Sequence, residues 1–317
     1  MLEALNFTKG AIARRDLVPA LTHFDIRNGR ITGYNGRIAL SSPIQVDLNV
    51  QPEAKSFIKA VETCSEEVAL HVTPAGKLAV RSGKFKAAIN CLNEAFPEIA
   101  PEGRDVHIRE DFMTALSKLH EFTSDDASRR WANAVLFSGK SAYATNNICV
   151  AEFWLGEEFP CEVAIPAQSI AELLRIGETP TRMQITEHSA TFHYTGGRWL
   201  HTALYDVKWP DIARVLNHPA NAVPLPAGLF EAVHSLRPFV DAMSRIYFLP
   251  NMVSTHPNPD LGANIELALP QGIAGVYHVD HLLLLEGVAD TIDFSRHPQP
   301  ALFFGKGLRG ALIGMRE

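Results

Sequence analysis

The amino-acid sequence predicts an α+β fold assembled from three tandem repeats of one unit of helices and antiparallel strands. Residues 164–216 read as a short helix, two or three strands and a Trp-Pro turn, and residues 50–99 run through the same order. A weaker third copy ends the chain, with a helix-like stretch at 278–287 followed by strands. Three copies in 317 residues give about 106 residues each, which is a domain-sized repeat.

The two stronger copies keep a constant register. Their landmark residues recur at offsets of 114, 114 and 113 residues. The landmarks are, in order, Pro52 and Pro166, Gly83 and Gly197, and Phe96 and Trp209. A register that holds over roughly fifty positions indicates repeated structure rather than chance similarity.

The copy at 164–216 has clear periodicity. Ile170, Leu173 and Leu174 fall at i, i+3 and i+4, which predicts a helix with one apolar face, ended by Gly177. Alternating apolar residues then predict two strands joined by a polar turn. These residues are Met183, Ile185, Ala190 and Phe192.

In the first repeat, residues 4–12 and 22–40 alternate as strands do, with hairpin turns at Asn28-Gly29 and Asn35-Gly36. A helix at 52–63 directs Phe57, Ile58 and Val61 inward. The linker at 101–103 places the first boundary near residue 104, so the first domain is 1–104.

The second domain, 105–218, opens with a helix whose apolar stripe runs from Phe112 to Phe122, followed by strands at 132–138 and 141–154. The Pro-rich stretch after residue 217 marks the next boundary. The third domain, 219–317, begins with a helix at 227–242, which Pro238 should kink or end. Residues 255–263 read as a loop.

Composition excludes several classes of protein. The chain is 46% hydrophobic and carries a net charge of −6, and no run approaches the eighteen or so apolar residues of a membrane span. The N-terminus does not resemble a signal peptide, which predicts a cytoplasmic protein. The four cysteines, at 64, 91, 149 and 161, have neither CxxC nor zinc spacing.

Two motifs resemble a cofactor-binding site and a metal site, but the residues around them do not support either site. The run Gly305–Gly310 matches GxGxxG, but too few residues follow it for the helix and βαβ unit that a dinucleotide site needs. His278 and His281 could share a helix face, yet no third metal ligand follows from the sequence. We therefore predict no metal, no cofactor and no enzymatic activity.

The repeat order carries a family resemblance. The run of helix, strands, Gly-basic-aromatic turn and WPDIARVL resembles the bacterial DNA polymerase III beta subunit, the sliding clamp. The opening DLVPAL with its later Gly-Arg-Ile, the segment VRSGKFKAAINCLNEAFPEI and the near-terminal Met315-Arg316 are similar to family segments. The individual motifs are degenerate, which indicates a divergent member, and phage or prophage origin is our guess. Clamps usually place a full helix in the Gly10–Pro19 interval, which this chain has shortened or lost.

The resemblance implies a ring of six domains, with helices inside and sheets outside, made by two chains joined head to tail. Such a homodimer encircles duplex DNA and acts as a polymerase processivity factor without catalysis of its own. A ring also explains the net charge of −6, because topology holds the DNA and only the inner wall needs positive charge. The DNA-facing candidates are Lys55, Lys59, Lys118, Arg129, Arg130, Arg175 and Arg237; each could equally be a solvated surface cation.

The family also binds peptide tails of polymerases and clamp loaders in an apolar pocket between its second and third domains. The matching positions are Thr145, Ile148, Val150, Pro210, Val215, Leu312, Ile313, Gly314 and Met315. The alternative is that these are ordinary core and linker residues. Gly314 stands where the family pattern has proline, which predicts a looser tail, and Glu317 replaces an apolar end.

Two other classes of function stay open. A clamp-like regulator or decoy could bind clamp partners without closing on DNA, which the thin basic lining favours. An enzyme with an unrecognised site would need a cluster of perturbed titratable groups in a deep pocket.

Overall fold

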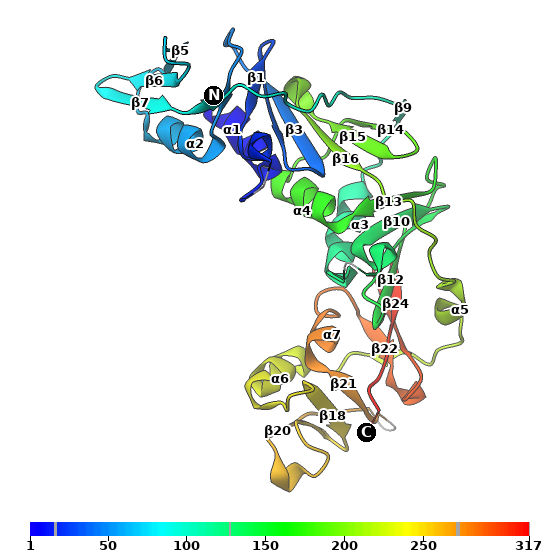
Figure 1. Cartoon of the computed structure of the whole chain (residues 1–317). Helices are drawn as coiled ribbons and strands as arrows, with labels where there is room; N and C mark the ends of the chain where they lie inside the picture. The colour runs from blue at the N-terminus through cyan, green and yellow to red at the C-terminus, as the bar shows by residue number, and fades with distance from the viewer. Residues whose placement is uncertain (16–17, 127, 271–272, 317) are drawn as a thin grey trace. The chain divides into compact units, whose positions relative to one another are not determined.

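The computed structural model describes residues 1–15, 18–126, 128–270 and 273–316 (Figure 1). The chain forms two compact units. Unit 1 comprises Met1–Glu110 and Gln168–Leu204, and unit 2 comprises Asp111–Ala167 and Tyr205–Glu317. Each unit contains a large antiparallel sheet that joins strands from neighbouring sequence repeats, so the middle repeat is divided between the units.

Unit 1 is built on a seven-stranded sheet with the order β1-β2-β3-β16-β15-β14-β9. Its strands are β1 (Asp25–Arg27), β2 (Arg30–Tyr34), β3 (Ile38–Pro43), β9 (Arg104–Val106), β14 (Arg182–Ile185), β15 (Ser189–His193) and β16 (Trp199–Ala203). The predicted turns are confirmed, because Asn28, Gly29 and Gly36 take the positive φ angles that such turns require. At the centre, Leu40 of β3 lies opposite Leu200 of β16.

The N-terminal segment corrects one prediction. Residues 4–12 are not a strand: Leu2–Thr8 form helix α1, continued by a 3-10 turn at Lys9–Ala11. Ala4, Leu5, Thr8 and Ala11 are buried, and their spacing suits a helix that packs on β2 and β3. The first repeat therefore keeps its helix, which lies before Gly10 rather than after it; Asp16 and Leu17 of the DLVPAL segment lie outside the described residues.

The second half of the first repeat holds α2 (Ala54–Thr63) and the meander β5 (Ala69–Val72), β6 (Leu78–Ser82) and β7 (Phe85–Ile89). Strands β4 (Gln51–Pro52) and β8 (Cys91–Leu92) pair beside it. As predicted, Phe57 and Val61 of α2 are buried and Ile58 packs against the same core. The Glu53 carboxylate accepts hydrogen bonds from the Lys55 and Ser56 amides and so caps α2. The corresponding helix of the middle repeat is α4 (Ala167–Ile176), with Ile170 and Leu173 buried.

Unit 2 is built on an eight-stranded sheet with the order β13-β10-β11-β12-β24-β23-β22-β17. Its strands are β10 (Ala134–Ser138), β11 (Ser141–Thr145), β12 (Cys149–Trp154), β13 (Val163–Pro166), β17 (Val223–Pro224), β22 (Thr291–Asp293), β23 (Ala301–Gly305) and β24 (Leu308–Leu312). Helix α3 (Phe112–Leu119) buries Phe112, Leu116 and Leu119, as its stripe predicted. The GxGxxG match forms the β23–β24 turn rather than the start of a helix, which agrees with its rejection.

Unit 2 also contains a four-stranded sheet with the order β20-β19-β18-β21. Its strands are β18 (Arg245–Leu249), β19 (Met252–Ser254), β20 (Asn264–Glu266) and β21 (Gly275–His278). Helix α6 (Leu229–Leu236) passes into a 3-10 turn that contains Pro238, which confirms that the predicted 227–242 helix ends at the proline. Helices α5 (Ala213–Leu216) and α7 (Val279–Leu283) are short, so α7 covers only part of the predicted 278–287 helix.

The element order repeats three times along the chain. Each copy runs helix, three-stranded meander, short strand, helix, three-stranded meander. Helices α2 and α4 occupy the same place in this order, because each follows a short strand and precedes a meander. The repeat read from the sequence is thus present in the described residues, and the domain limits 1–104, 105–218 and 219–317 stay a prediction about folding units.

Within the described residues, no helix is long and apolar enough to cross a membrane. In the part of the chain that the structure describes, Cys64, Cys91, Cys149 and Cys161 form no disulfide. Burial raises the pKa of the Cys149 thiol far above its usual range, so this residue behaves as a small apolar side chain.

Candidate partner-binding surface, DNA-facing groups and a cavity

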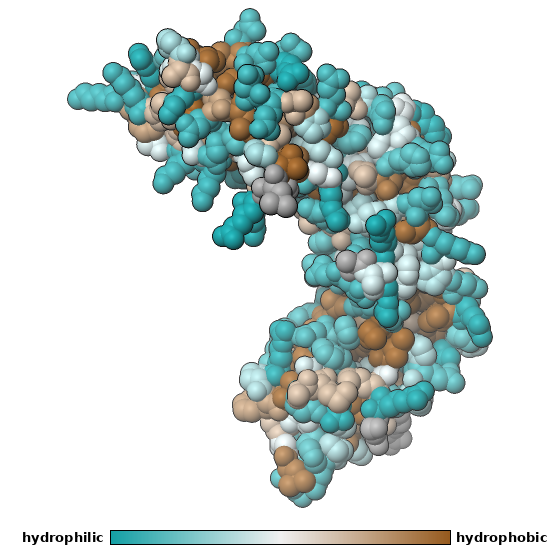
Figure 2. Space-filling model, viewed as in Figure 1, coloured by the Kyte–Doolittle hydropathy of each residue, from teal (hydrophilic) through white to brown (hydrophobic). Residues whose placement is uncertain are grey.

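An apolar cluster, here called the α5 surface, lies on unit 2 where α5 covers the sheet. Val150, Leu216, Leu302 and Ala311 form its buried floor. Ile212, Val215, Ala220 and Phe304 pack against this floor and remain partly exposed. Figure 2 shows hydrophobic surface in the region where Figure 1 places β22 and β24.

Local sequence explains why α5 lies on the sheet. After the Trp209-Pro210 turn, the Ile212 amide donates to the Pro210 carbonyl and the Leu216 amide donates to the Ile212 carbonyl. This single helical turn brings the apolar side chains of Val215 and Leu216 onto the floor of the cluster. Strand β12 meets β24 directly beneath them, with Val150 opposite Ala311.

The β11–β12 turn borders the α5 surface and is held by its own polar groups. The Asn146 carboxamide oxygen accepts from the amides of Ile148 and Cys149 at 3.0 and 2.7 Å. The Thr145 hydroxyl donates to the Cys149 carbonyl at 2.7 Å, and Asn147 takes φ +77°. Asparagine suits these positions because its side chain can close a turn and its backbone tolerates positive φ.

The C-terminal tail is tied to this turn and to β21. The Ile313 amide donates to the Ile148 carbonyl at 3.0 Å, and the Met315 amide donates to the Val276 carbonyl at 2.7 Å. His297 Nε2 lies 2.8 Å from the Met315 carbonyl oxygen. A Cβ on Gly314 would approach His297 Cδ2 to 2.5 Å. These contacts fix the position of the tail in the structure, and the looser tail expected from the absent proline stays a prediction; Glu317 lies outside the described residues.

The structure brings most of the predicted pocket residues together but gives them different roles. Val150 and Val215 belong to the α5 surface, and Ile148 is joined to Ile313. Thr145 and Leu312 are buried, so they support the surface from beneath. Pro210 is exposed and lies outside the cluster. Sequence reasoning missed Ile212, Ala220 and Phe304, although Ile212 stands three residues before Val215.

The predicted DNA-facing cations lie on different kinds of element. Lys55 and Lys59 are exposed one turn apart on α2, and Lys118 lies on α3. Arg129 and Arg130 stand at the start of a 3-10 turn rather than on a helix. In the described residues, none of the three lysines forms an ion pair.

Three of the arginines are paired with carboxylates of their own chain. Arg175 contacts Glu172 at 2.5 Å, Arg237 contacts Asp280 at 2.6 Å and Arg129 lies 3.8 Å from Asp126. Arg175 also donates to the Asn6 and Phe7 carbonyls, which links α4 to the end of α1. Each pair reduces the positive charge available to a phosphate backbone.

The two histidines at the start of α7 lie against each other. The rings of His278 and His281 stack at 4.7 Å between centroids, and no group of three metal-ligating side chains occurs in the described part of the chain. Burial, and then the neighbouring His278, lower the pKa of His281. The protonated form of His281 is therefore disfavoured relative to that of an ordinary histidine.

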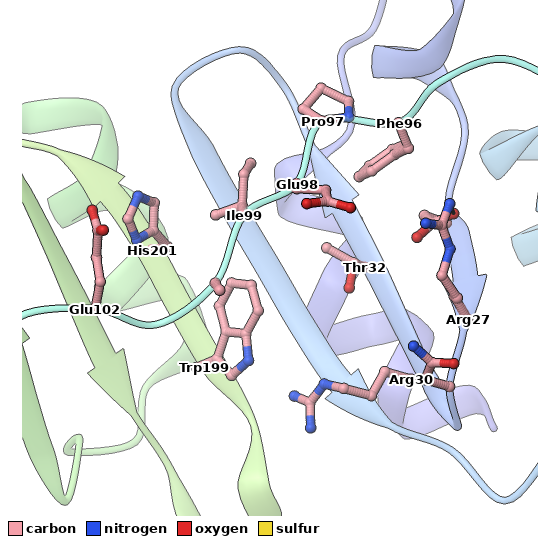
Figure 3. Close-up of a pocket in the computed structure, with 13 residues that line it drawn as sticks. Arg27, Arg30, Thr32, Phe96, Pro97, Glu98, Ile99, Glu102, Trp199 and His201 are labelled. Carbon is pink, nitrogen blue, oxygen red and sulfur yellow. Dashed lines mark hydrogen bonds and ion pairs between the residues drawn. The ribbon is translucent and has the colours of Figure 1, made fainter.

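A cavity of about 600 Å³ lies in unit 1 between the sheet and the extended segment 96–102, here called the strap. Figure 3 shows the strap, with Pro97, Glu98 and Ile99, crossing the strands that carry Thr32 and Trp199, and the Arg30 side chain extending away from the strap. The Arg30 guanidinium lies 5.9 Å from the centroid of the Trp199 ring. No prediction from the sequence included this cavity.

These features together define the fold: repeated pairs of helices and antiparallel meanders, with sheets shared between neighbouring repeats, form the clamp fold. Solved structures agree over the whole chain. The chain is similar to the DNA polymerase III beta sliding clamp of Bartonella birtlesii, solved with griselimycin, with 19% identity and a TM-score of 0.85. It is similar to the Caulobacter crescentus pol III beta protein with 17% identity and a TM-score of 0.83.

The similarity extends to nearly the full length of these clamps. In both cases 100% of this chain aligns with 97% of the other. The Streptococcus pneumoniae beta chain gives 18% identity and a TM-score of 0.80. No protein-family model and no curated relative matches the chain. The chain thus has the fold of the bacterial beta sliding clamps at a divergence where sequence similarity is slight.

Proposed function

We propose that this protein is a sliding clamp that encircles duplex DNA and tethers a DNA polymerase as a processivity factor. The observation that carries the proposal is the similarity to beta sliding clamps over 97% of their length, with TM-scores of 0.80 to 0.85. The chain contains all three repeats, so two copies supply the six domains of such a ring. The proposed clamp acts on DNA in the cytoplasm. It performs no catalysis itself.

The decisive experiment is topological. The protein is loaded with a clamp loader onto a nicked circular plasmid, and the complex is isolated in high salt. A clamp stays on the circle and is released when a restriction enzyme linearises the plasmid, because only topology holds it. Equal loss from circles and linear DNA would remove the proposal.

The proposed ring needs a second copy of the chain, and strand topology indicates how it joins. In unit 1 the third strands of two meanders, β3 and β16, pair with each other. In unit 2 the third strands β12 and β24 pair in the same way. The two remaining third strands are β7 and β20, and each is paired on one side only in the described structure. If third strands of meanders pair with each other between copies as well, β20 of one copy pairs with β7 of another, and the copies join head to tail.

The repeats also supply a register for this joint. Glu152 and Arg309 lie opposite each other across β12 and β24 and form an ion pair at 2.5 Å. The Ala263 carbonyl accepts a hydrogen bond that closes the β19–β20 connection, and the Cys149 carbonyl does the same for the β11–β12 turn. Glu266 stands three residues after Ala263, and Glu152 stands three residues after Cys149, so the two glutamates occupy equivalent positions. Lys86 is the second residue after the two-residue turn of its hairpin, and Arg309 is the second residue after the turn of the equivalent hairpin. In this register Glu266 of one copy faces Lys86 of its partner.

The α5 surface is the proposed docking site for peptide tails of the polymerase and the clamp loader. Ile212, Val215 and Phe304 are partly exposed there, and we assign Ile313 and the flexible Met315 of the tail to the same docking site. Such a surface accepts apolar side chains of a short peptide. The Bartonella birtlesii clamp was solved with griselimycin bound, which supports a ligand-binding role for this fold.

A second candidate is a clamp-like regulator that binds clamp partners without closing on DNA. The ion pairs of Arg129, Arg175 and Arg237 favour it, because they weaken a DNA-facing lining. Sedimentation analysis separates the two candidates. A monomer at micromolar concentration that still binds partner tails would support the regulator, and a dimer supports the ring.

A further inference from the structure

The C-terminal tail pairs with β21 through one isolated bridge, in which Met315 lies opposite Val276. In a hydrogen-bonded antiparallel pair, the two residues exchange two backbone bonds, one in each direction. The first of these bonds is direct here, because the Met315 amide donates to the Val276 carbonyl at 2.7 Å. The groups that would form the second bond are the Val276 amide and the Met315 carbonyl.

An imidazole nitrogen contacts both of these groups. His297 Nε2 lies 3.3 Å from the Val276 amide nitrogen and 2.8 Å from the Met315 carbonyl oxygen. A ring nitrogen either donates or accepts, and cannot do both at once. The carbonyl can only accept and its contact is the shorter one, so we assign a proton to Nε2 that is donated to Met315. The side chain of His297 thus supplies a donor to the tail.

The ring fits at this place because two glycines leave room for it. A Cβ on Gly314 would approach His297 Cδ2 to 2.5 Å, and a Cβ on Gly275 would approach the same atom to 2.9 Å. Carbon atoms pack at about 3.5–4.0 Å, so either side chain would displace the ring. The Tyr277 ring lies on a further side, with its centroid 5.9 Å from that of His297. Packing therefore fixes the orientation of the imidazole.

Gly314 also explains why the tail needs such a contact. It stands where the family pattern has proline. Proline restricts a tail through its fixed φ angle, whereas glycine is the residue with the greatest backbone freedom. The same glycine leaves the space that the His297 ring occupies. A side chain from another part of the chain can thus restrict the tail in place of its own backbone.

The segment that carries His297 is itself anchored. Asp293, at the end of β22, is buried, and its Oδ1 accepts from the amide and the hydroxyl of Ser295 at 3.1 and 2.6 Å. Its Oδ2 accepts from the Asn221 amide at 3.0 Å. Asn221 directly follows Ala220, which belongs to the α5 surface. One buried carboxylate therefore joins the segment next to the α5 surface to the turn that ends at His297.

We propose that His297 is a positioning residue of the partner-binding site, which holds the Met315 carbonyl and thereby fixes the tail for an incoming peptide. The proposal rests on the proposed docking of peptides at the α5 surface and the tail. His297 acts through the backbone of Met315, so the side chains of Met315 and Ile313 stay available to the peptide; both are at least partly exposed. A tail that is already ordered loses less conformational entropy when the peptide binds, which increases affinity.

Three substitutions separate the hydrogen bond from the packing of the ring. His297→Ala removes both, His297→Phe keeps a ring without the donor, and His297→Gln keeps an N–H donor without the ring. Exchange of the tail amides is measured by hydrogen-exchange mass spectrometry on the full chain without peptide. His297→Ala and His297→Phe should speed exchange about tenfold, because the bridge opens more often, and His297→Gln should stay within about twofold of the unaltered protein.

The same proteins are then titrated with the C-terminal peptide of the replicative polymerase. His297→Ala and His297→Phe should weaken its binding about fivefold, and His297→Gln should bind it as the unaltered protein does. The control is His188→Ala, which makes the same change at an exposed position between β14 and β15 of unit 1. It should alter neither tail exchange nor peptide affinity. Thermal unfolding checks that every variant folds.

Tail exchange that is unchanged in His297→Ala would overturn the proposal. So would a His297→Phe variant that protects the tail fully, or a His297→Gln variant that protects it no better than His297→Ala, because packing and not the donor would then hold the tail. Faster exchange with unchanged peptide affinity would overturn the positioning role. A peptide that does not bind the unaltered protein would remove the proposed docking site, whereas the exchange measurement made without peptide still decides whether His297 holds the tail, so the two proposals fail separately.

Discussion

Val215 and Met315 are the residues on which partner binding should depend most directly. Val215 is half-buried on the α5 surface, and Met315 is half-buried on the C-terminal tail. A peptide bound with micromolar affinity has about 8 kcal/mol of binding free energy. Val215→Ala or Met315→Ala should each reduce it by about 1–2 kcal/mol, measured by titration with the C-terminal peptide of the replicative polymerase.

The control for this pair is Lys140→Ala, which changes an exposed residue of the same unit outside the α5 surface. It should leave the peptide affinity unchanged. If Val215→Ala and Met315→Ala also leave it unchanged while all proteins stay folded, the peptide binds elsewhere.

Glu53 gives a pH-dependent contribution to stability. Burial by itself would raise the pKa of Glu53, but hydrogen bonds from Ser56 and from the Lys55 amide outweigh it, so the pKa lies below the ordinary 4.5. Stabilisation by the charged cap is therefore complete above that ordinary value and is lost as pH falls through the lowered one. Glu53→Ala should cost about 1 kcal/mol of unfolding free energy at pH 7.

Urea unfolding at pH 7 and pH 3 checks this prediction, and the difference between Glu53→Ala and the unaltered protein should shrink at pH 3. Glu62→Ala, in the last turn of the same helix, is the control. A carboxylate near a helix C-terminus is unfavourable, so its removal should not destabilise. A pH-independent cost of Glu53→Ala would show that the charge plays no part in capping.

At the scale of elements, the edge strands β7 and β20 should form the joint between copies with Lys86 facing Glu266. Both residues are exposed in the single chain. Lys86→Glu and Glu266→Lys should each weaken the dimer, because like charges then face each other across the strands. The double variant restores opposite charges and should recover the dimer, measured by analytical ultracentrifugation.

The double variant is its own control, because it carries both substitutions and yet pairs opposite charges. A dimer that is weakened by each single change and not rescued by the double change would exclude this register. A dimer unaffected by either change would place the joint on other elements.

For the whole molecule, the ion pair of Arg237 and Asp280 should limit the positive charge that the proposed ring presents to DNA. Asp280→Asn leaves Arg237 free to contact a phosphate. If Arg237 lines the ring, affinity for linear duplex DNA should rise, and the log–log salt slope should steepen by about 0.9 for one added phosphate contact. Filter binding over a salt series measures both.

Asp260→Asn, on the 255–263 loop, makes the same change in net charge away from Arg237 and is the control. It should leave the slope unchanged. An equal effect of the two variants would mean that net charge, and not a lining arginine, controls DNA binding.

The sequence by itself determined the apolar faces of α2, α3 and α4, because these depend on spacings within a few residues of each other. It also determined the repeat and its register, because the same order of landmark residues recurs along the chain. It could not determine α1, since a stretch as short as Leu2–Thr8 supports strand and helix patterns alike until packing on β2 and β3 decides between them. The α5 surface was predicted in part: Val150 and Val215 came from the resemblance, whereas Phe304 joins them only because β23 lies beside β24. The tertiary structure alone decided the pairing of β3 with β16 and of β12 with β24, the ion pair of Arg237 with Asp280 and the cavity above Arg30. Each joins residues far apart in the chain, and their meeting depends on how whole sheets pack rather than on any local preference.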